Sequence, residues 1–299
     1  MARIGFLGAA SASGFAKQIA GLRAGLKELG YVEGKNIEIE FRWAEGKLDR
    51  LPALAAELVK APVDVIVTQG VPATRAAKGA TNKIPIVIAA TGDAVSTGLV
   101  ASLARPGGNV TGLTFFALEL SQKRLELLKR AMPQVTRVGV LFNPDNPIQQ
   151  GPLRKAMSEA AAALNLELEW AAGRSPKEFE AAVSAVAGKR VEAVVFNEEP
   201  MQLVNATALG QAALKNRLAT IGPLEFAERG AVLAYGVDVP ELYRRSAYFV
   251  DKILKGAKPG DLPVEQATRF ELVVNLRAAS QLGLSIPAPL VQRADRVIE

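Results

Sequence analysis

The chain has 299 residues, 49% of them hydrophobic, which suffices for two packed domains of ordinary size. It contains no cysteine and no histidine, so disulfides, thiolate chemistry, serine–histidine catalysis and histidine-ligated zinc are excluded. The net charge is +6 without a long basic run, so we expect a mixed-sign surface that does not bind nucleic acid. These features favour a binding protein over an enzyme, and no apolar run is long enough to span a membrane.

Strands and helices alternate along the first third of the chain. Apolar runs predict strands at 3–8, 36–43, 63–68 and 84–90, and apolar residues at helical spacing predict helices at 15–29 and 48–60. A third helix is expected from Pro72, and a short fourth one between the turn at 91–93 and Leu103. The segment Arg105–Phe115, RPGGNVTGLTF, then turns the chain and continues as a strand at 110–115.

The same alternation repeats through the rest of the chain. It predicts strands at 137–142, 167–172, 193–196, 219–221, 231–235 and 270–275, and helices at 121–132, 152–164, 176–186, 203–215 and 241–254. We therefore expect an α/β fold of two doubly wound parallel-sheet lobes joined by three hinge crossings, at 110–115, near Asp238 and near Glu265. The expected N-terminal lobe is 1–116 plus 240–265, and the C-terminal lobe is 117–239 plus 266–299.

Ligands of open parallel sheets bind beyond the carboxyl ends of the strands, so the residues that follow each strand are the candidate binding residues. In the first lobe these are Ser11, Ser13, Trp43, Gln69, Gly70, Thr91, Asp93 and Thr114. In the second lobe and its crossing they are Asn143, Asn146, Asn197, Glu198, Tyr235 and Asp238.

Each candidate also has a purely structural explanation. The two serines can cap a helix as well as bind a carboxylate, and Asp93 can cap a helix as well as meet an ammonium group. Trp43 can pack beneath a loop, and Gly70 can simply serve a turn. For the pair Glu198–Glu199 we expect two solvated side chains. No dinucleotide fingerprint or P-loop occurs, so we expect no cofactor, and we expect no metal.

Five segments, in order along nearly the whole chain, resemble the periplasmic substrate-binding proteins of ABC importers, in the family that includes tryptophan- and other aromatic-amino-acid-binding members. They are GLKELGYVEGKNIEIEFRWAEGKLDRLPALAAELV (25–59), LVASLARPGGNVTGLTF (99–115), KRLELLKRAMP (123–133), FNPDNP (142–147) and DLPVEQATRFELVVNLRAASQLGLSIP (261–287). The resemblance implies a type I periplasmic-binding fold, hinge closure around a small solute and delivery to an ABC permease in the inner membrane. By position, the family's ligand loops fall on Ser11, Ser13, Gln69, Gly70, Thr91, Asp93, Thr114, Asn143, Asn197 and Asp238.

We therefore expect a monomeric, non-enzymatic receptor. Its expected solute is an amino acid, with either an aromatic or a branched side chain, or a related carboxylate. Asp93 or Asp238 would meet the ammonium group, while Trp43, Phe115 or Tyr235 would pack on an apolar side chain. A cytoplasmic ligand sensor or regulatory domain of the same fold is the alternative, and a carboxylate enzyme is a third. The start, MARIGFLGAA, lacks a signal-peptide pattern, which fits either a cytoplasmic protein or a mature domain with an added initiator Met. Because the resemblance implies export, we expect a periplasmic protein whose leader is not part of this sequence.

Overall fold

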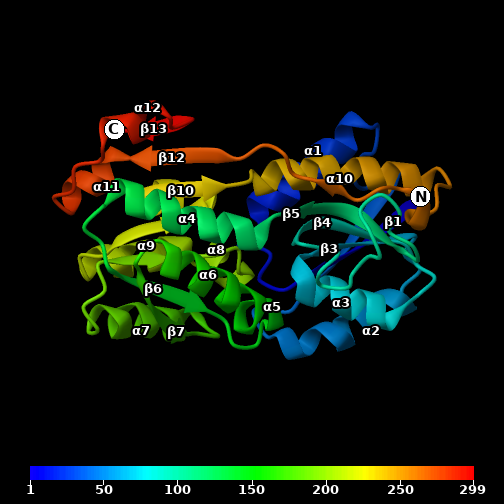
Figure 1. Cartoon of the computed structure of the whole chain (residues 1–299). Helices are drawn as coiled ribbons and strands as arrows, with labels where there is room; N and C mark the ends of the chain where they lie inside the picture. Colours follow the sequence, from blue (N-terminus) through cyan, green and yellow to red (C-terminus); the bar gives the residue numbers. More distant parts are fainter. The chain divides into compact units, whose positions relative to one another are not determined.

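The computed structural model describes residues 1–299, apart from the side chains of Pro147 and Pro176. The chain forms two compact units: unit 1 comprises 1–116 and 238–268, and unit 2 comprises 117–237 and 269–299. The chain therefore passes between the units three times, as the colours of Figure 1 allow the reader to follow. Each unit is assembled from segments that are far apart in the sequence.

Unit 1 is built on a six-stranded parallel sheet with the order β11-β5-β4-β3-β1-β2. Its strands are β1 (Ala2–Gly8), β2 (Ile37–Trp43), β3 (Val65–Gln69), β4 (Ile86–Gly92), β5 (Val110–Phe115) and β11 (Glu265–Gln266). Every residue of β3 and of β5 is buried, as expected for strands that are covered on both faces.

Helices cover both faces of this sheet. Helices α1 (Ala16–Glu28) and α10 (Val239–Leu254) lie on one face, and α2 (Leu51–Lys60) and α3 (Gly70–Ala80) on the other (Figure 1). Two 3-10 turns, η1 (Leu48–Arg50) and η3 (Pro259–Asp261), complete the unit.

Two glycines bring α1 and α10 into close contact. A Cβ at Gly21 would lie 2.3 Å from the carbonyl oxygen of Pro240, and a Cβ at Gly25 would lie 2.1 Å from that of Arg244. From the first contact to the second, the chain advances by four residues along α1 and by four residues along α10. The two helices therefore run in the same direction. The first turn of α10 therefore lies at the same end of the unit as the first turn of α1.

Unit 2 is built on a seven-stranded sheet with the order β13-β12-β10-β9-β8-β6-β7. Its strands are β6 (Arg137–Phe142), β7 (Glu167–Ala172), β8 (Ala193–Val195), β9 (Ala219–Gly222), β10 (Leu233–Gly236), β12 (Glu271–Asn275) and β13 (Arg296–Ile298). The five strands from β6 to β10 are parallel, whereas β12 is antiparallel to β10, and β13 is parallel to β12.

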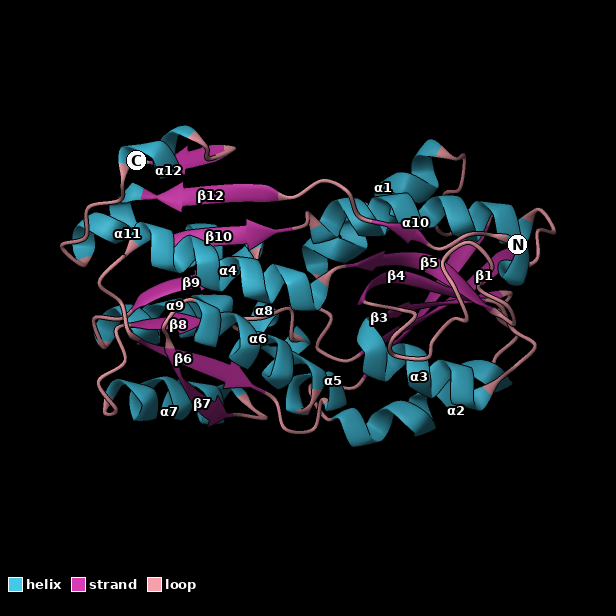
Figure 2. Cartoon of the chain, viewed as in Figure 1, coloured by secondary structure: helices cyan, strands magenta, loops and turns pink.

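The longer helices of unit 2 pair on the two faces of its sheet (Figure 2). Helices α4 (Ala117–Ala131) and α6 (Pro152–Ala163) share one face, and α7 (Pro176–Ala187) and α9 (Ala206–Lys215) share the other. The short elements are α5 (Pro147–Gln150), α8 (Pro200–Val204), η2 (Leu224–Arg229), α11 (Leu276–Gln281) and α12 (Ala288–Gln292).

The structure confirms the expected α/β class with two mostly parallel sheets and differs in three details. Residues 94–100 form turns instead of the short helix, because Asp93 holds the nearby N–H groups and Gly98 has a φ of +72°. The helix expected at 203–215 is divided at Asn205 into α8 and α9. The strand expected at 270–275 is antiparallel, since it enters the sheet from a crossing and not from a βαβ unit.

In the part of the chain that the structure describes, the helices are all too short or too polar to cross a bilayer.

Candidate functional site

The two sheets share one strand order, and this order places the candidate site in each unit. The first five strands are arranged β2-β1-β3-β4-β5 in unit 1 and β7-β6-β8-β9-β10 in unit 2. In such sheets the order reverses beside the first strand, and ligands bind outside the carboxyl ends at that switch point. The relevant loops therefore follow β1 and β3 in unit 1, and β6 and β8 in unit 2.

An aromatic cluster lies at the carboxyl ends of β1 and β2. The ring of Trp43 stacks on Phe41, with centroids 5.8 Å apart and planes 5° apart, and its centroid lies 5.0 Å from that of Phe6. A Cβ at Gly8 would lie only 2.3 Å from an atom of the Trp43 indole, so the absent side chain makes room for this ring. The indole therefore lies across the end of β1, half-buried.

The loops at the switch point of unit 1 carry polar groups with few partners. The Ser11 hydroxyl accepts the N–H of Gly14 at 3.3 Å and lies 3.3 Å from that of Ser13, and neither serine is the N-cap of α1. Gln69 is buried, and its Oε1 has no hydrogen-bond partner among the described residues. Gly70 follows with a φ of +74°, a conformation that favours glycine.

The remaining candidates of unit 1 hold turns and helix starts. The hydroxyl of Thr114 donates to the carbonyl of Thr91 and accepts the N–H of Ala94, both at 3.1 Å, so β5 is tied to the loop after β4. Asp93 accepts the N–H groups of two residues in the following turn, and Asp238 is the N-cap of α10. Because α10 is parallel to α1, Asp238 lies toward the carboxyl edge of this sheet.

In unit 2 the switch-point loops are joined by a buried polar network. Asn143, which follows β6, donates from Nδ2 to Oε1 of Glu199 at 3.1 Å. Asn197, which follows β8, accepts the hydroxyl of Ser121 and donates to the carbonyl of Leu141. The structure thus connects the two loops through side chains that are almost wholly buried.

Glu199 is the ionisable member of this network. It is 1% exposed and also accepts the N–H of Gln202 as the N-cap of α8. Burial raises the pKa of this carboxyl, and the hydrogen bonds from Asn143 and from backbone N–H groups act in the opposite direction. Asn146 in the loop after β6 is also buried and accepts the N–H of Ile148, which supports the turn into α5.

The expectation that Glu198 and Glu199 are solvated is wrong. The Glu198 side chain is 7% exposed and forms an ion pair with Arg124, which is fully buried on α4. Arg124 also donates from Nε and Nη2 to the carbonyl of Tyr235, at 2.9 and 2.7 Å. The backbone of Tyr235 is therefore part of the site, whereas its ring stacks on Phe270 with centroids 6.3 Å apart.

A further carboxylate, that of Glu225, lies in η2, which follows β9, and interacts electrostatically with both members of this ion pair. Both of its oxygens are buried, and within the described structure neither accepts a hydrogen bond from another residue. The pKa of Glu225 is raised to about 7, mainly by burial and to a lesser extent by the charge of Glu198, while a contact with its own backbone N–H and the charges of Arg124 and Arg229 act in the opposite direction. Glu225 is thus the least satisfied ionisable group at this edge of the sheet.

Neither Arg124 nor Glu225 is among the binding residues expected from the sequence. The signal for Arg124 was its position on the apolar stripe of α4, where Leu120, Leu128 and Ala131 are buried at helical spacing. A charge on such a stripe needs a buried partner. For Glu225 there was no comparable signal, because burial of its oxygens depends on packing of loops distant in sequence.

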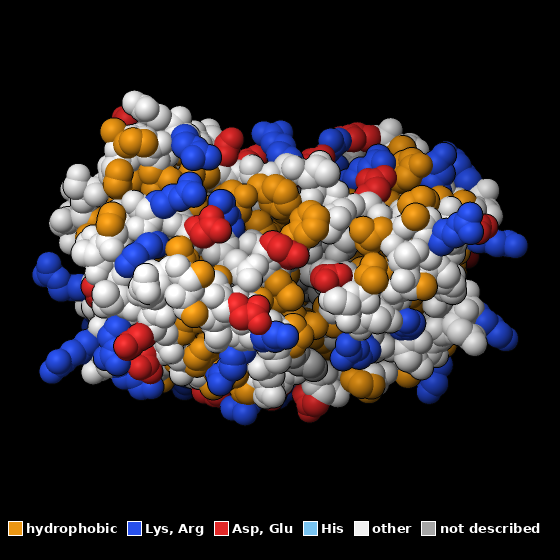
Figure 3. All heavy atoms as spheres, in the orientation of Figure 1, with side chains coloured by type: hydrophobic (Ala, Val, Ile, Leu, Met, Phe, Trp, Pro, Cys, Tyr) orange, Lys and Arg blue, Asp and Glu red, His pale blue; other side chains and the backbone are white. Residues whose placement is uncertain are grey.

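The described side chains include no group of three or more His, Cys, Asp or Glu residues placed to hold a metal ion. Figure 3 shows basic and acidic side chains interspersed on the visible face of the molecule. These charges are mixed in sign on both units, with apolar side chains between them.

Comparisons with known proteins agree with this architecture. A family model described as "ABC transporter substrate binding protein" matches residues 4–298. A crystal structure of a conserved domain protein from Vibrio cholerae is similar with a TM-score of 0.92 and 30% identity over 99% of both chains. A domain from Streptococcus pneumoniae in complex with L-Trp has a TM-score of 0.90 and 26% identity over 99% of both chains. A tyrosine-binding protein of Clostridioides difficile is 28% identical over 251 residues, 84% of this chain and 72% of the relative.

Proposed function

Because this chain belongs to the family of ABC transporter substrate-binding proteins, whose fold is of the type I periplasmic-binding class, we propose that it binds an aromatic amino acid and delivers it to a membrane permease. Binding occurs without chemical conversion of the solute. The two units close around the solute as lobes, and the closed form is the one that the permease recognises. We place the receptor in the periplasm and take it to be a monomer.

The observation that carries the aromatic assignment is the ring cluster at the carboxyl end of β1. The indole of Trp43 lies half-buried against Gly8, at the switch point where ligands of this sheet class bind. An aromatic solute side chain gains both apolar burial and offset stacking against such a ring. Relatives that bind tyrosine or carry L-Trp support the same solute class.

The polar groups of the loops suit the backbone part of an amino acid. The hydroxyls of Ser11 and Ser13 offer donors to a carboxylate. Gln69 and Thr91 lie at the ends of the neighbouring strands β3 and β4, and Asn143 and Asn197 follow the neighbouring strands β6 and β8 in unit 2. In this proposal each loop contributes to one solute.

The proposal is tested first by identifying what the protein binds. Native mass spectrometry of the purified chain reveals a co-purified molecule, and calorimetry then measures affinities for L-tryptophan, L-tyrosine, L-leucine and L-glutamate. We expect the two aromatic amino acids to bind at least about tenfold more tightly than leucine. Preference for leucine or glutamate, or no binding of any amino acid, would contradict the proposal.

Closure is tested separately by small-angle scattering with and without the bound solute. We expect a smaller radius of gyration in the bound state. An unchanged radius at saturation would remove closure from the mechanism while leaving the solute assignment intact.

A further inference from the structure

We propose that the carboxylate of Glu225 binds the ammonium group of the solute and is the residue that selects amino acids over their desamino analogues. This assignment rests on the proposed function and specifies which atom recognises the charged nitrogen. It differs from the expectation that Asp93 or Asp238 does so.

The first step is that Glu225 has buried acceptor oxygens left over, whereas each of those two aspartates already supports a turn or a helix start through one oxygen. Oδ1 of Asp93 accepts the N–H groups of Val95 and Ser96, and Oδ1 of Asp238 accepts the N–H of Glu241. Both oxygens of Glu225 are buried and, in the described part of the chain, neither accepts a hydrogen bond from another residue; the one backbone contact is with the N–H of Glu225 itself. A buried carboxylate left in this state is costly unless something else pairs with it.

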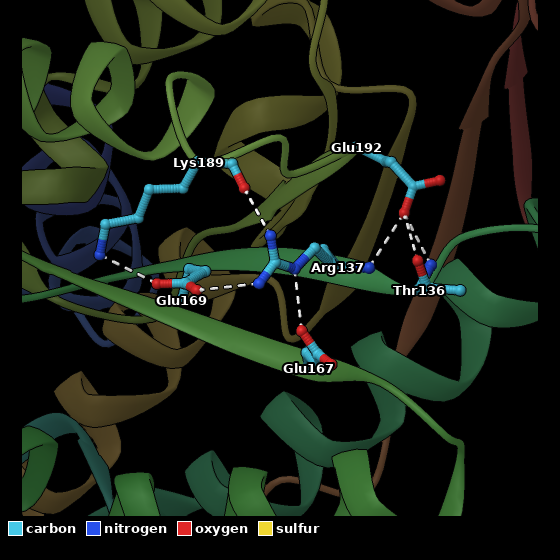
Figure 4. Close-up of polar contacts among 6 residues, drawn as sticks. All are labelled: Thr136, Arg137, Glu167, Glu169, Lys189 and Glu192. Carbon is cyan, nitrogen blue, oxygen red and sulfur yellow. Dashed lines mark hydrogen bonds and ion pairs between the residues drawn. The ribbon is translucent and has the colours of Figure 1, made fainter.

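Glu192, elsewhere in unit 2, is an example of a carboxylate whose charge is stabilised by hydrogen bonds from the protein. In Figure 4 one of its oxygens points toward the start of β6, where it accepts the N–H and hydroxyl of Thr136 and the N–H of Arg137. Burial opposes ionisation of Glu192, but these hydrogen bonds outweigh it and lower its pKa. Around it Arg137 contacts Glu167 and Glu169, and Lys189 contacts Glu169. Charges at this amino edge are thus paired internally.

The charge balance at the carboxyl edge is different. Arg124 directs its hydrogen bonds to Glu198 and to the carbonyl of Tyr235, so the charge of one buried guanidinium acts on two carboxylates but is hydrogen-bonded to only one of them. Arg229 also attracts Glu225 electrostatically, but it donates its hydrogen bond to the carbonyl of Leu203. One monovalent cationic group with hydrogen-bond donors would balance the charge of the second carboxylate.

The location of Glu225 fits a ligand group as well. Strand β9 lies between β8 and β10, so the loops that carry Glu198, Glu225 and Gly236 are neighbours. A Cβ at Gly236 would lie 3.2 Å from Nη2 of Arg124 and 3.7 Å from Oε1 of Glu198, so glycine leaves space beside the ion pair. In unit 1 the unpartnered buried atom of the switch-point loop, Oε1 of Gln69, is also an acceptor. Buried acceptors of this kind are satisfied by a solute group that carries several N–H donors, as an ammonium group does.

The test compares L-tryptophan with 3-(indol-3-yl)propionate, which has the same ring and carboxylate but no ammonium group. Calorimetry is carried out on the unmodified chain, on Glu225→Gln and on Glu119→Gln, which removes an exposed carboxylate of α4. We expect Glu225→Gln to weaken L-tryptophan binding about 30-fold or more and to leave the analogue unchanged, because truncating one partner of a buried charge pair is costly. Glu119→Gln should bind both as the unmodified chain does.

Equal affinities of Glu225→Gln and the unmodified chain for L-tryptophan would overturn the assignment, and so would an equal loss for both compounds. If the unmodified chain binds no amino acid, the proposed function fails and this assignment fails with it.

A second measurement needs no variant. The groups that face Glu225 are Glu198, Arg124 and Arg229, and together with burial they leave it largely protonated at pH 6. Pairing with an ammonium requires the ionised carboxylate, so L-tryptophan should release close to one proton at pH 6 and the analogue should not. Calorimetry in two buffers of different ionisation enthalpy measures this number, and zero release with L-tryptophan would overturn the assignment.

Discussion

Because Gly8 has no side chain, the indole of Trp43 can lie on the end of β1. Substitution Gly8→Ala places a methyl group where the ring now sits, 2.3 Å from its nearest atom. We expect the ring to be displaced and the free energy of unfolding to fall by about 1–3 kcal/mol. Fluorescence in a Trp170→Phe background, where Trp43 is the remaining tryptophan, reports its displacement as a shifted emission maximum.

An unchanged emission maximum together with an unchanged melting temperature would show that the ring has other room to move. The matched control is Gly79→Ala, since a Cβ there meets nothing within 4 Å.

The carboxyl of Glu225 makes unit 2 less stable as pH rises. Its pKa is raised to about 7 in the folded state, so the unfolded chain releases this proton at lower pH than the folded chain does. Stability is therefore lost between about pH 4.5 and pH 7, and the loss amounts to about 3 kcal/mol at most. In the absence of solute, Glu225→Gln should gain melting temperature relative to the unmodified chain across this pH window.

Glu119→Gln should show no comparable trend in melting temperature with pH, because that side chain is exposed. A difference between Glu225→Gln and the unmodified chain that stays flat from pH 4.5 to 8 would contradict the burial of Glu225 in the folded state.

At the scale of elements, the contact between α1 and α10 depends on two glycines. Gly25→Ala would place a methyl group 2.1 Å from the carbonyl oxygen of Arg244, so the helices must separate. We expect a loss of about 2 kcal/mol or more in the free energy of unfolding of unit 1, measured by chemical denaturation. By contrast, Gly79→Ala in α3 should gain up to about 1 kcal/mol, because alanine favours helix and has space there. Equal effects of both substitutions would contradict the close packing.

Elements with strong periodicity were predictable from the sequence, and those fixed by long-range pairing were not. The stripe of α10, with Leu242, Phe249 and Ile253 among its buried residues, indicates a helix without any knowledge of its partner. The two-residue strand β11 exists only because Glu265 pairs with Leu113, 152 positions earlier in the chain. Its local sequence carries no strand pattern.

The same distinction applies to the candidate site. Its loops could be located because the carboxyl ends of parallel strands follow from the strand order. The partners within them could not, because Arg124 meets Glu198 across 74 positions and Tyr235 across 111. Local sequence suggested a solvated pair at 198–199, whereas tertiary contacts bury both carboxylates.

At the scale of the whole molecule, each unit depends on a segment that arrives late in the sequence. Residues 269–299 supply β12 and β13 and core side chains that include Leu272, Val274 and Leu290. Deletion of residues 269–299 should therefore expose the core of unit 2 beside β10. We expect unit 2 to lose protection against amide hydrogen exchange, while β1, β3 and β4 of unit 1 remain protected.

Full protection of β6, β8 and β9 in the shortened chain would show that unit 2 folds without its last segment. Deletion of residues 293–299 alone removes only the edge strand β13 and serves as the milder comparison.

An odd number of crossings has a practical consequence for the two ends of the chain. With three passages, Met1 belongs to unit 1 and Glu299 to unit 2. A donor fluorophore fused at one end and an acceptor at the other would therefore report any movement between the units as a change in energy transfer. Fusions at residues 1 and 299 would make this chain a scaffold for a genetically encoded indicator of its own solute, with no permutation or internal insertion.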